Sequence, residues 1–247
     1  MEFPCTINGL TVEASYSDRS VEEIFLPLLR SLGKLQKEKG RRILVMLAAP
    51  PGAGKSTLSL FLQKLSEDDP DLTPLTAIGM DGFHCFRSYL AAHTIVRDGE
   101  EFPLSKIKGA PETFDLKLLR ERIELLLQGG DTPWPHYDRM LHDPVDNAIL
   151  VTGDIVLLEG NYLLLDEPGW RELKTLADYT IRIDAPEESL YDRLVTRKAA
   201  SGALTWQQAE DHVRFSDLAN VRRCLSNSFD GDLNLRMLPD GEYVLRA

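Results

Sequence analysis

Cysteine and positive charge are both scarce in this sequence, and each shortage excludes a class of protein. The 247 residues include three cysteines, Cys5, Cys85 and Cys224, and no Cys-x-x-Cys pair. Scattered cysteines in an odd number argue against a disulfide framework and a zinc knuckle, and they suit a reducing compartment. Lysine and arginine total 28 against 39 aspartates and glutamates, which gives a net charge of −11. The backbones of DNA and RNA are also negatively charged and would repel so acidic a chain. We therefore expect no nucleic-acid partner.

Long apolar runs are also missing. No segment approaches the roughly 20 consecutive apolar residues that span a bilayer, so we expect no membrane partner. The N-terminal stretch MEFPCTINGLTVE lacks a basic region followed by an apolar segment. We therefore expect no secretory signal and a cytoplasmic protein. Hydrophobic residues make up 43% of the chain and charged residues 27%, which is enough for the core of one α/β domain or two small ones.

What the sequence does contain is a phosphate-binding pattern within LAAPPGAGKSTLSLFLQKL, residues 47–65. The pattern is A-x-x-x-x-G-K-S, with Ala49 in place of the usual first glycine. The apolar run RILVMLA before it predicts a buried strand, and apolar residues at helical spacing after it predict a helix. In a strand, loop and helix of this kind, backbone N–H groups and the helix N-terminus can surround a phosphate chain. The alternative is an ordinary turn with a solvated lysine.

The loop residues have distinct expected contacts with a nucleotide. Two glycines, Gly52 and Gly54, permit close approach of the backbone, and the Lys55 ammonium would meet the β- and γ-phosphates. The hydroxyl of Ser56 would be a ligand of Mg²⁺. The predicted nucleotide-binding residues are Pro51, Gly52, Ala53, Gly54, Lys55, Ser56 and Thr57.

Strand and helix patterns alternate along the chain. Residues 6–12, TINGLTV, predict a hairpin with Asn8-Gly9 as its turn, and the apolar spacing from Val21 to Leu35 predicts a helix that ends near Gly40. We expect these residues, 1–40, to form an extension that serves packing rather than chemistry, on a main domain of residues 41–247. Three further strands are predicted in LTAIGM, DIVLLEG and DYTIRID, a helix between Asp115 and Gly129-Gly130, and a closing hairpin around Asp240-Gly241. This alternation favours an α/β fold with a mostly parallel sheet covered on both faces.

Two acidic residues lie at predicted strand ends. In an open α/β sheet, ligands bind beyond the carboxyl ends of the strands. Asp81, in GMDGFH, and Glu159, in VLLEGNY, are therefore expected near the phosphate loop, with Gly82 letting the chain turn away so that the Asp81 carboxylate faces the cleft. Such a carboxylate can orient Mg²⁺ or accept the proton of an attacking hydroxyl. Both residues also suit ordinary turns, because Asp-Gly and Glu-Gly pairs are common there.

Several motifs in order resemble the P-loop kinases of the uridine kinase, phosphoribulokinase and bacterial pantothenate kinase group. They are APPGAGKST, MDGFH, KGAPETFD, WPHYDR, VLLEGNYLLL and LYDRLVTRK, spread over residues 40–225. The chain looks most similar to the uncharacterised or sugar-kinase-like relatives within that group. This resemblance implies a P-loop NTPase three-layer sandwich with a mostly parallel sheet and a helical lid, besides the small N-terminal hairpin-helix extension.

The resemblance also implies roles for individual residues. Asp81 matches the aspartate that activates the acceptor hydroxyl, although Glu159 as the base, with Asp81 organising Mg²⁺, stays an open alternative. Glu159 matches the second acidic strand end and, with Ser56, is the expected metal ligand. Lys108, Phe114, Tyr137 and Arg139 match acceptor-contacting segments, and Arg193 and Arg197 match lid arginines that meet the phosphates. The expected cofactors are ATP and Mg²⁺. The long link of residues 91–107 has no assigned role.

The leading functional hypothesis is a small-molecule kinase that phosphorylates a hydroxyl of a nucleoside, a pantothenate-like alcohol or a sugar. The alternative is a nucleotide-binding switch or an NTPase that acts on a protein partner, although no base-reading NKxD motif is present. A homodimer, the commonest soluble assembly, is compatible with the sequence. The spacing of Cys85 and the three histidines His84, His136 and His142 matches no standard zinc pattern.

Overall fold

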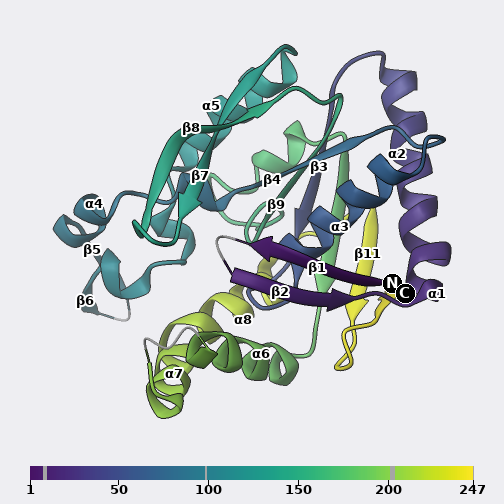
Figure 1. Cartoon of the computed structure of the whole chain (residues 1–247). Coiled ribbons are helices and arrows are strands. Elements are labelled where there is room, and N and C mark those ends of the chain that lie inside the picture. Colours follow the sequence, from purple (N-terminus) through teal and green to yellow (C-terminus); the bar gives the residue numbers. More distant parts are fainter. Residues whose placement is uncertain (8–9, 98, 201–203, 247) are drawn as a thin grey trace.

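A six-stranded sheet with the order β12-β11-β10-β3-β9-β4 lies at the centre of the protein (Figure 1). The computed structural model describes residues 1–7, 10–97, 99–200 and 204–246. Neighbouring strands of the sheet are parallel except for the antiparallel pair β11 and β12. The strands are β3 (Ile43–Ala48), β4 (Leu75–Gly79), β9 (Ile155–Gly160), β10 (Tyr179–Asp184), β11 (Leu233–Met237) and β12 (Tyr243–Leu245).

Helices and three small hairpins surround this sheet. The hairpins pair β1 (Glu2–Ile7) with β2 (Leu10–Ser15), β5 (Thr94–Arg97) with β6 (Glu100–Pro103), and β7 (Thr132–Asp138) with β8 (Asp143–Val151). The helices are α1 (Asp18–Ser20), α2 (Leu26–Lys39), α3 (Lys55–Asp68), α4 (Arg87–Ala92), α5 (Leu116–Leu127), α6 (Glu187–Ala200), α7 (Trp206–His212) and α8 (Leu218–Asn227). Single helical turns of 3-10 type cover Asp81–Phe83, Leu104–Ile107, Pro111–Thr113 and Leu173–Leu176, and π-type turns cover Val21–Phe25 and Val213–Asp217.

The central strand β3 divides the core into two apolar clusters. Its six residues are all buried, and successive side chains of a strand point to opposite faces. Ile43, Val45 and Leu47 join a cluster with apolar residues of α2, α3 and α6, whereas Leu44, Met46 and Ala48 join one with α5, Trp134 and Trp170. This arrangement confirms the predicted three-layer α/β sandwich with a mostly parallel sheet, and it confirms the buried strand that precedes the phosphate loop.

The sequence signals at element ends are also confirmed where the structure describes them. Gly40 ends α2 in the left-handed conformation, with φ of 62°, which a glycine adopts without strain. The Asp115 side chain accepts a hydrogen bond from the Leu118 N–H and caps α5. The predicted Asn8-Gly9 turn lies outside the described residues, although the strands on either side of it pair as expected. Among the described residues, no helix is both long and apolar enough to cross a membrane.

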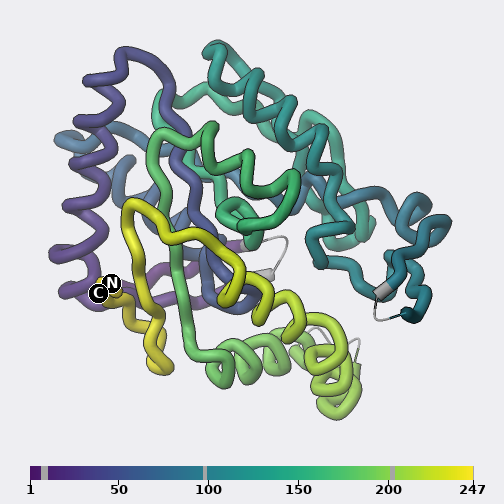
Figure 2. Tube along the Cα trace, turned by 180° about the vertical axis from the view of Figure 1, so that it is seen from behind, coloured from purple at the N-terminus to yellow at the C-terminus, as the bar shows by residue number. Residues whose placement is uncertain are grey.

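The N-terminal residues pack on the outer side of α3 through aromatic rings. Phe61 of α3 stacks on Tyr16, with ring centroids 4.1 Å apart, and makes edge contacts with Phe3 and Phe25. The first and last described residues of the chain lie near each other, as Figures 1 and 2 show. We propose on this basis that residues 1–40 and the main domain share one core.

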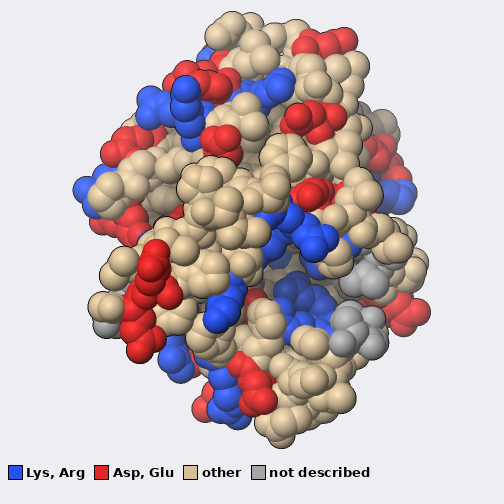
Figure 3. Space-filling view, turned by 90° about the vertical axis from the view of Figure 1, so that its left-hand side faces the viewer, with Lys and Arg blue, Asp and Glu red and all other residues tan. Residues whose placement is uncertain are grey.

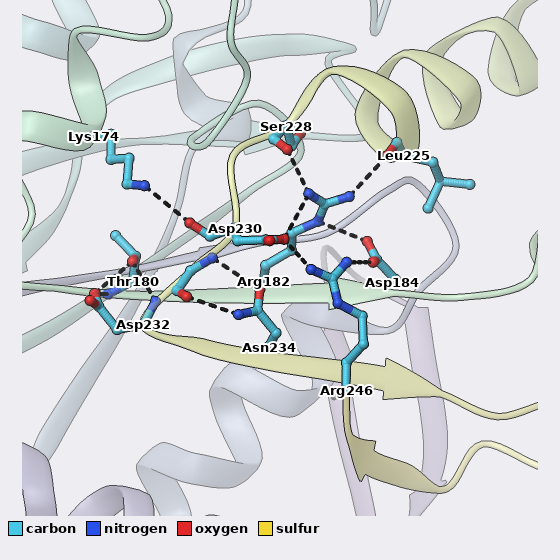
Figure 4. A network of polar contacts seen from close by, with 11 residues as sticks. Lys174, Thr180, Arg182, Asp184, Leu225, Ser228, Asp230, Asp232, Asn234 and Arg246 are labelled. Carbon is cyan, nitrogen blue, oxygen red and sulfur yellow. Dashed lines mark hydrogen bonds and ion pairs between the residues drawn. The ribbon is translucent and has the colours of Figure 1, made fainter.

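A polar network fastens the C-terminal hairpin to β10 (Figure 4). Arg182 is 8% exposed and donates hydrogen bonds to Asp184 and to the carbonyl oxygens of Leu225 and Ser228. Arg246, which follows β12, forms ion pairs with Asp184 and Asp230. A buried arginine is stable only with such partners, so the network gives β11 and β12 a defined position at the edge of the sheet.

Removal of the Phe61 ring tests whether the extension and the main domain share a core. Phe61→Ala should lower the free energy of unfolding by about 3–5 kcal/mol, since it leaves a cavity beside the three rings of Phe3, Tyr16 and Phe25. Leu125→Ala, at a side chain that is 41% exposed, is the matched control and should change stability little. Urea denaturation should show a single transition for each variant. Two separate transitions would show that residues 1–40 unfold independently.

Candidate active site

The phosphate loop connects the end of β3 to the start of α3. Its glycines, Gly52 and Gly54, have φ angles of 86° and 77°, in the left-handed region that L side chains rarely adopt. A Cβ at Gly52 would also lie 3.1 Å from the Leu194 side chain of α6. The two predicted glycines are therefore required by backbone conformation, and the loop ends at the N-terminus of a helix, where anions bind.

The Glu159 carboxylate contacts both Lys55 and Ser56 of the phosphate loop. The Lys55 Nζ is 3.8 Å from Glu159 Oε2, and the Ser56 hydroxyl donates a hydrogen bond of 2.6 Å to Glu159 Oε1. Sheet register explains the contact, since Glu159 pairs with Leu47 of β3 on one side and Gly79 of β4 on the other. Burial raises the pKa of the Glu159 carboxyl, and the charge of Lys55 opposes that rise.

Asp81 lies two residues beyond the end of β4, at the same edge of the sheet. Burial alone would raise the pKa of its carboxyl, but the charge that His84 carries when it is protonated at low pH, and the charges of Lys55, Arg139 and Arg197, lower that pKa overall. Asp81 is therefore ionised at neutral pH. The chain turns at Gly82, which lies within the 3-10 turn Asp81–Phe83. A Cβ at Gly82 would lie 2.3 Å from the Pro135 carbonyl oxygen, so glycine is also needed for the close approach of β7.

His84 belongs to this site, which the sequence did not indicate. Its ring lies over Phe114, with centroids 4.0 Å apart, and meets the Tyr137 ring edge-on at 5.3 Å. Burial lowers the pKa of His84 to about 4, so the imidazole is neutral at neutral pH. Its Nδ1 atom is buried and has no hydrogen-bond partner among the described residues.

The residues matched to acceptor-contacting segments gather partly around Asp81. Lys108 Nζ donates hydrogen bonds of 2.6 Å to the Tyr137 hydroxyl and 2.8 Å to the His142 carbonyl oxygen. Tyr137 and Asp81 line a cavity of 190 Å³, together with His136, Ser56 and Glu159. Phe114, by contrast, is 6% exposed and packs behind His84 against Tyr162 and Trp170. Phe114 is therefore a core residue beneath His84 and does not line the cavity.

A second, larger cavity of 690 Å³ adjoins the phosphate loop. It brings together ten of the predicted residues, and the five charged ones come from four separate elements: Lys55, Asp81, Arg139, Arg193 and Arg197. Figure 3 shows lysine and arginine side chains gathered in a hollow on this side of an otherwise acidic protein. The remaining lining residues are Thr11, Val12, Pro51, Gly52, Gly54, Ser56, Thr57, Asn161, Asp192, Thr196 and Ala200. Ala53, predicted as a nucleotide contact, is completely buried.

The N-terminal hairpin also reaches both cavities. Thr6 of β1 lines the smaller one, and Thr11 and Val12 of β2 line the larger one. This element, which was expected to serve packing rather than chemistry, therefore also contributes to the walls of both cavities. Its register pairs Thr6 with Thr11, which places both residues on the same face of the hairpin near its described end.

The donor set at the sheet edge suits Mg²⁺. The Ser56 hydroxyl and the Glu159 carboxylate supply two adjoining oxygens, the ligand type that Mg²⁺ prefers. Within the described ranges, no three His, Cys, Asp or Glu side chains cluster to hold a metal ion by themselves. Mg²⁺ commonly takes one or two protein ligands and completes its shell with waters and nucleotide phosphates, so these two oxygens are sufficient.

A mostly parallel sheet and a glycine-rich loop that opens a helix are the features of a P-loop fold, and the arginines of α6 line the cavity beside that loop. Residues 44–239 match the phosphoribulokinase/uridine kinase family, and the chain belongs to that family. A relative in Escherichia coli, uncharacterized protein YggC, is 43% identical over 244 residues, which cover 98% of each chain. Pantothenate kinase of Shewanella putrefaciens is 32% identical over 209 residues, which cover 74% of this chain and 62% of the relative.

A solved structure from Silicibacter sp. TM1040 is also similar. It is described as a "putative fructose transport system kinase", is 33% identical and superposes with a TM-score of 0.72. The match covers 83% of this chain and 98% of the Silicibacter chain. The structure of yeast YFH7 superposes almost as well, with a TM-score of 0.71 over 87% of this chain and 99% of its own, but at 19% identity it supports the fold alone.

The depressed pKa of His84 predicts how stability depends on pH. The folded protein holds this imidazole neutral down to a pKa of about 4, whereas the unfolded chain protonates it near 6.5. As the pH falls from 6.5 toward 4 the unfolded state binds more protons, so stability should fall by at most about 3 kcal/mol. Urea denaturation of the parent and of His84→Gln at pH 7.5, 6 and 4.5 measures this contribution. As the pH falls, the free energy of unfolding should decrease more for the parent than for His84→Gln. A constant difference between them would contradict the buried neutral imidazole.

Proposed function

We propose that this protein transfers the γ-phosphoryl group of ATP to a hydroxyl group of a small metabolite, in an Mg²⁺-dependent reaction. One observation carries the proposal: the phosphate loop, three arginines and the ionised Asp81 face a single cavity. A nucleotide switch needs the phosphate loop but not a carboxylate opposite it. The unpaired cysteines support the cytoplasm as the compartment of this activity.

The nucleotide half of the cleft neutralises phosphate charge. The loop amides and the Lys55 ammonium would hold the phosphates, and Ser56 and Glu159 would hold Mg²⁺. Bound Mg²⁺ would supply positive charge to the phosphate oxygens. Lys55 and Ser56 both contact the Glu159 carboxylate. When a nucleotide binds, a phosphate would replace that carboxylate as the partner of Lys55.

The acceptor half of the cleft supports proton transfer from a hydroxyl. Asp81 lies where the two cavities meet, because it lines both of them. The depressed pKa keeps its carboxylate ionised and able to accept the hydroxyl proton as the phosphoryl group is transferred. Arg193 and Arg197 would spread the charge that develops on the transferred group, with most effect in the transition state.

The acceptor classes that we propose are a nucleoside, a pantothenate-like alcohol or a sugar. Polar side chains line the smaller cavity, including Tyr137 and His136, and its 190 Å³ suits a small acceptor. The solved relative described as a "putative fructose transport system kinase" favours a sugar within this set.

An acceptor screen tests the proposed function. MgATP and the purified protein would be incubated with hydroxylated metabolites of the three classes, with ADP release and the phosphorylated product measured together. Lys55→Ala, prepared in the same way, is the control for contaminating kinases and should form no product. Strong acceptor dependence of ADP release is expected. ATP hydrolysis at the same rate with every acceptor and with none would favour an NTPase or a switch instead.

Asp81→Asn separates the proposed base from the proposed metal ligand. Asparagine keeps the size of aspartate but cannot take a proton, so turnover should fall by about a hundredfold to ten-thousandfold while MgATP binding is retained. Glu159→Gln should instead raise the Mg²⁺ concentration needed for half-maximal activity, because it weakens an oxygen ligand. Activity titrated with Mg²⁺ distinguishes the two. If high Mg²⁺ restored the turnover of Asp81→Asn, Asp81 would be the metal ligand and Glu159 the base.

A further inference from the structure

Two carbonyl groups of the phosphate loop accept hydrogen bonds from side chains outside the loop. Arg193 Nε donates to the Gly52 carbonyl oxygen at 2.9 Å, and the Tyr243 hydroxyl donates to the Ala53 carbonyl oxygen at 3.1 Å. Two more carbonyls are satisfied by the backbone, since Ala53 N–H donates to Pro50 and Leu58 N–H donates to Gly54. When amides of a loop converge on an anion, its carbonyls face outward and need donors of their own.

The Tyr243 side chain is buried, and its hydroxyl is a hydrogen-bond donor at neutral pH. The residue is 5% exposed, and burial raises the pKa of its phenol to about 12, so the hydroxyl stays protonated at neutral pH. Its ring packs between the N-terminal residues and the loop, with centroids 6.2 Å from Tyr16 and 5.9 Å from Phe25. The hydroxyl also lies close to the next loop residue, since a Cβ at Gly54 would be 3.3 Å from it.

The N-terminal extension holds Tyr243 in place. Glu242, the residue before it, accepts hydrogen bonds of 2.7 Å from the Ser17 hydroxyl and 3.0 Å from the Ser20 hydroxyl. The Ser20 hydroxyl is also 3.3 Å from the Tyr243 carbonyl oxygen. On the other side, Tyr243 pairs with Met237 of β11, whose hairpin is fastened by the network in Figure 4. Ser17, Ser20 and Tyr243 all lie outside residues 44–239, the part that matches the family.

We propose that Tyr243 is a positioning residue for the phosphate loop. Its hydroxyl holds the Ala53 carbonyl outward and thereby keeps the following amides directed at the nucleotide phosphates. Ser17, Ser20 and Tyr243, which lie outside the matched residues 44–239, thus help to hold the phosphate loop in position. This inference rests on the proposed binding of ATP, and it assigns to the extension and β12 an effect on nucleotide affinity.

Tyr243→Phe removes this one hydrogen bond and keeps the ring. The Ala53 carbonyl would be left buried without its donor, and the dissociation constant for MgATP should rise by about threefold to thirtyfold. Calorimetric titration with MgATP measures it at a temperature at which circular dichroism shows each variant to be folded. Tyr16→Phe is the matched control: its ring stacks on Phe61, and within the described residues its hydroxyl donates no hydrogen bond to the loop. It should leave the affinity unchanged.

The outcomes separate this inference from the proposed function. Failure of the parent protein to bind MgATP would refute the proposed function itself. Equal affinities of the parent and Tyr243→Phe, or an equal loss in both variants, would overturn the role of Tyr243, because a purely structural residue alters stability without altering affinity in folded protein. If Tyr243→Phe does not fold, Glu242→Ala loosens β12 from Ser17 and Ser20 instead. Its MgATP affinity should also fall, and an unchanged value would overturn the proposal.

Discussion

The site depends on keeping the buried carboxylate of Glu159 close to a cation. Glu159 is 9% exposed, and a charge so far from water must be paired and hydrogen-bonded. Lys55 and Ser56 provide both contacts, and the register of β3, β9 and β4 brings them together. The same register brings Asp81 to the edge at which the phosphate loop begins. The position of β9 between β3 and β4 therefore places the proposed nucleotide half of the cleft beside the proposed acceptor half.

The two carboxylates at this edge differ in their surroundings, and their proposed roles follow from that difference. Burial dominates at Glu159 and raises its pKa, whereas surrounding cations dominate at Asp81 and lower its pKa. Neighbouring acids whose pKa values move in opposite directions commonly divide their tasks. The hydrogen bond from Ser56 supports Glu159 as the residue on the Mg²⁺ side, which leaves Asp81 to the acceptor.

Local signals in the sequence predicted the sheet, the phosphate loop and the two acidic residues at the strand ends. They sufficed because loop glycines, strand-end acids and helix spacing are properties of short segments. Contacts between distant segments could not be predicted in this way. Tyr243 reaches a loop 190 residues away, and the hairpin threonines reach cavities that other elements build. His84 was missed because its role depends on burial against Phe114, and Phe114 was expected to line a pocket that it instead supports.

A crystal structure with Mg²⁺ and a non-hydrolysable ATP analogue tests the central claim most directly. If one cleft serves both substrates, the phosphates will lie on the amides of residues 52–57, and Lys55 will leave Glu159 for a phosphate oxygen. The terminal phosphate will then face Asp81 across the space in which an acceptor hydroxyl fits. Phosphates bound elsewhere, or a terminal phosphate on the side of the nucleotide away from Asp81, would contradict this account.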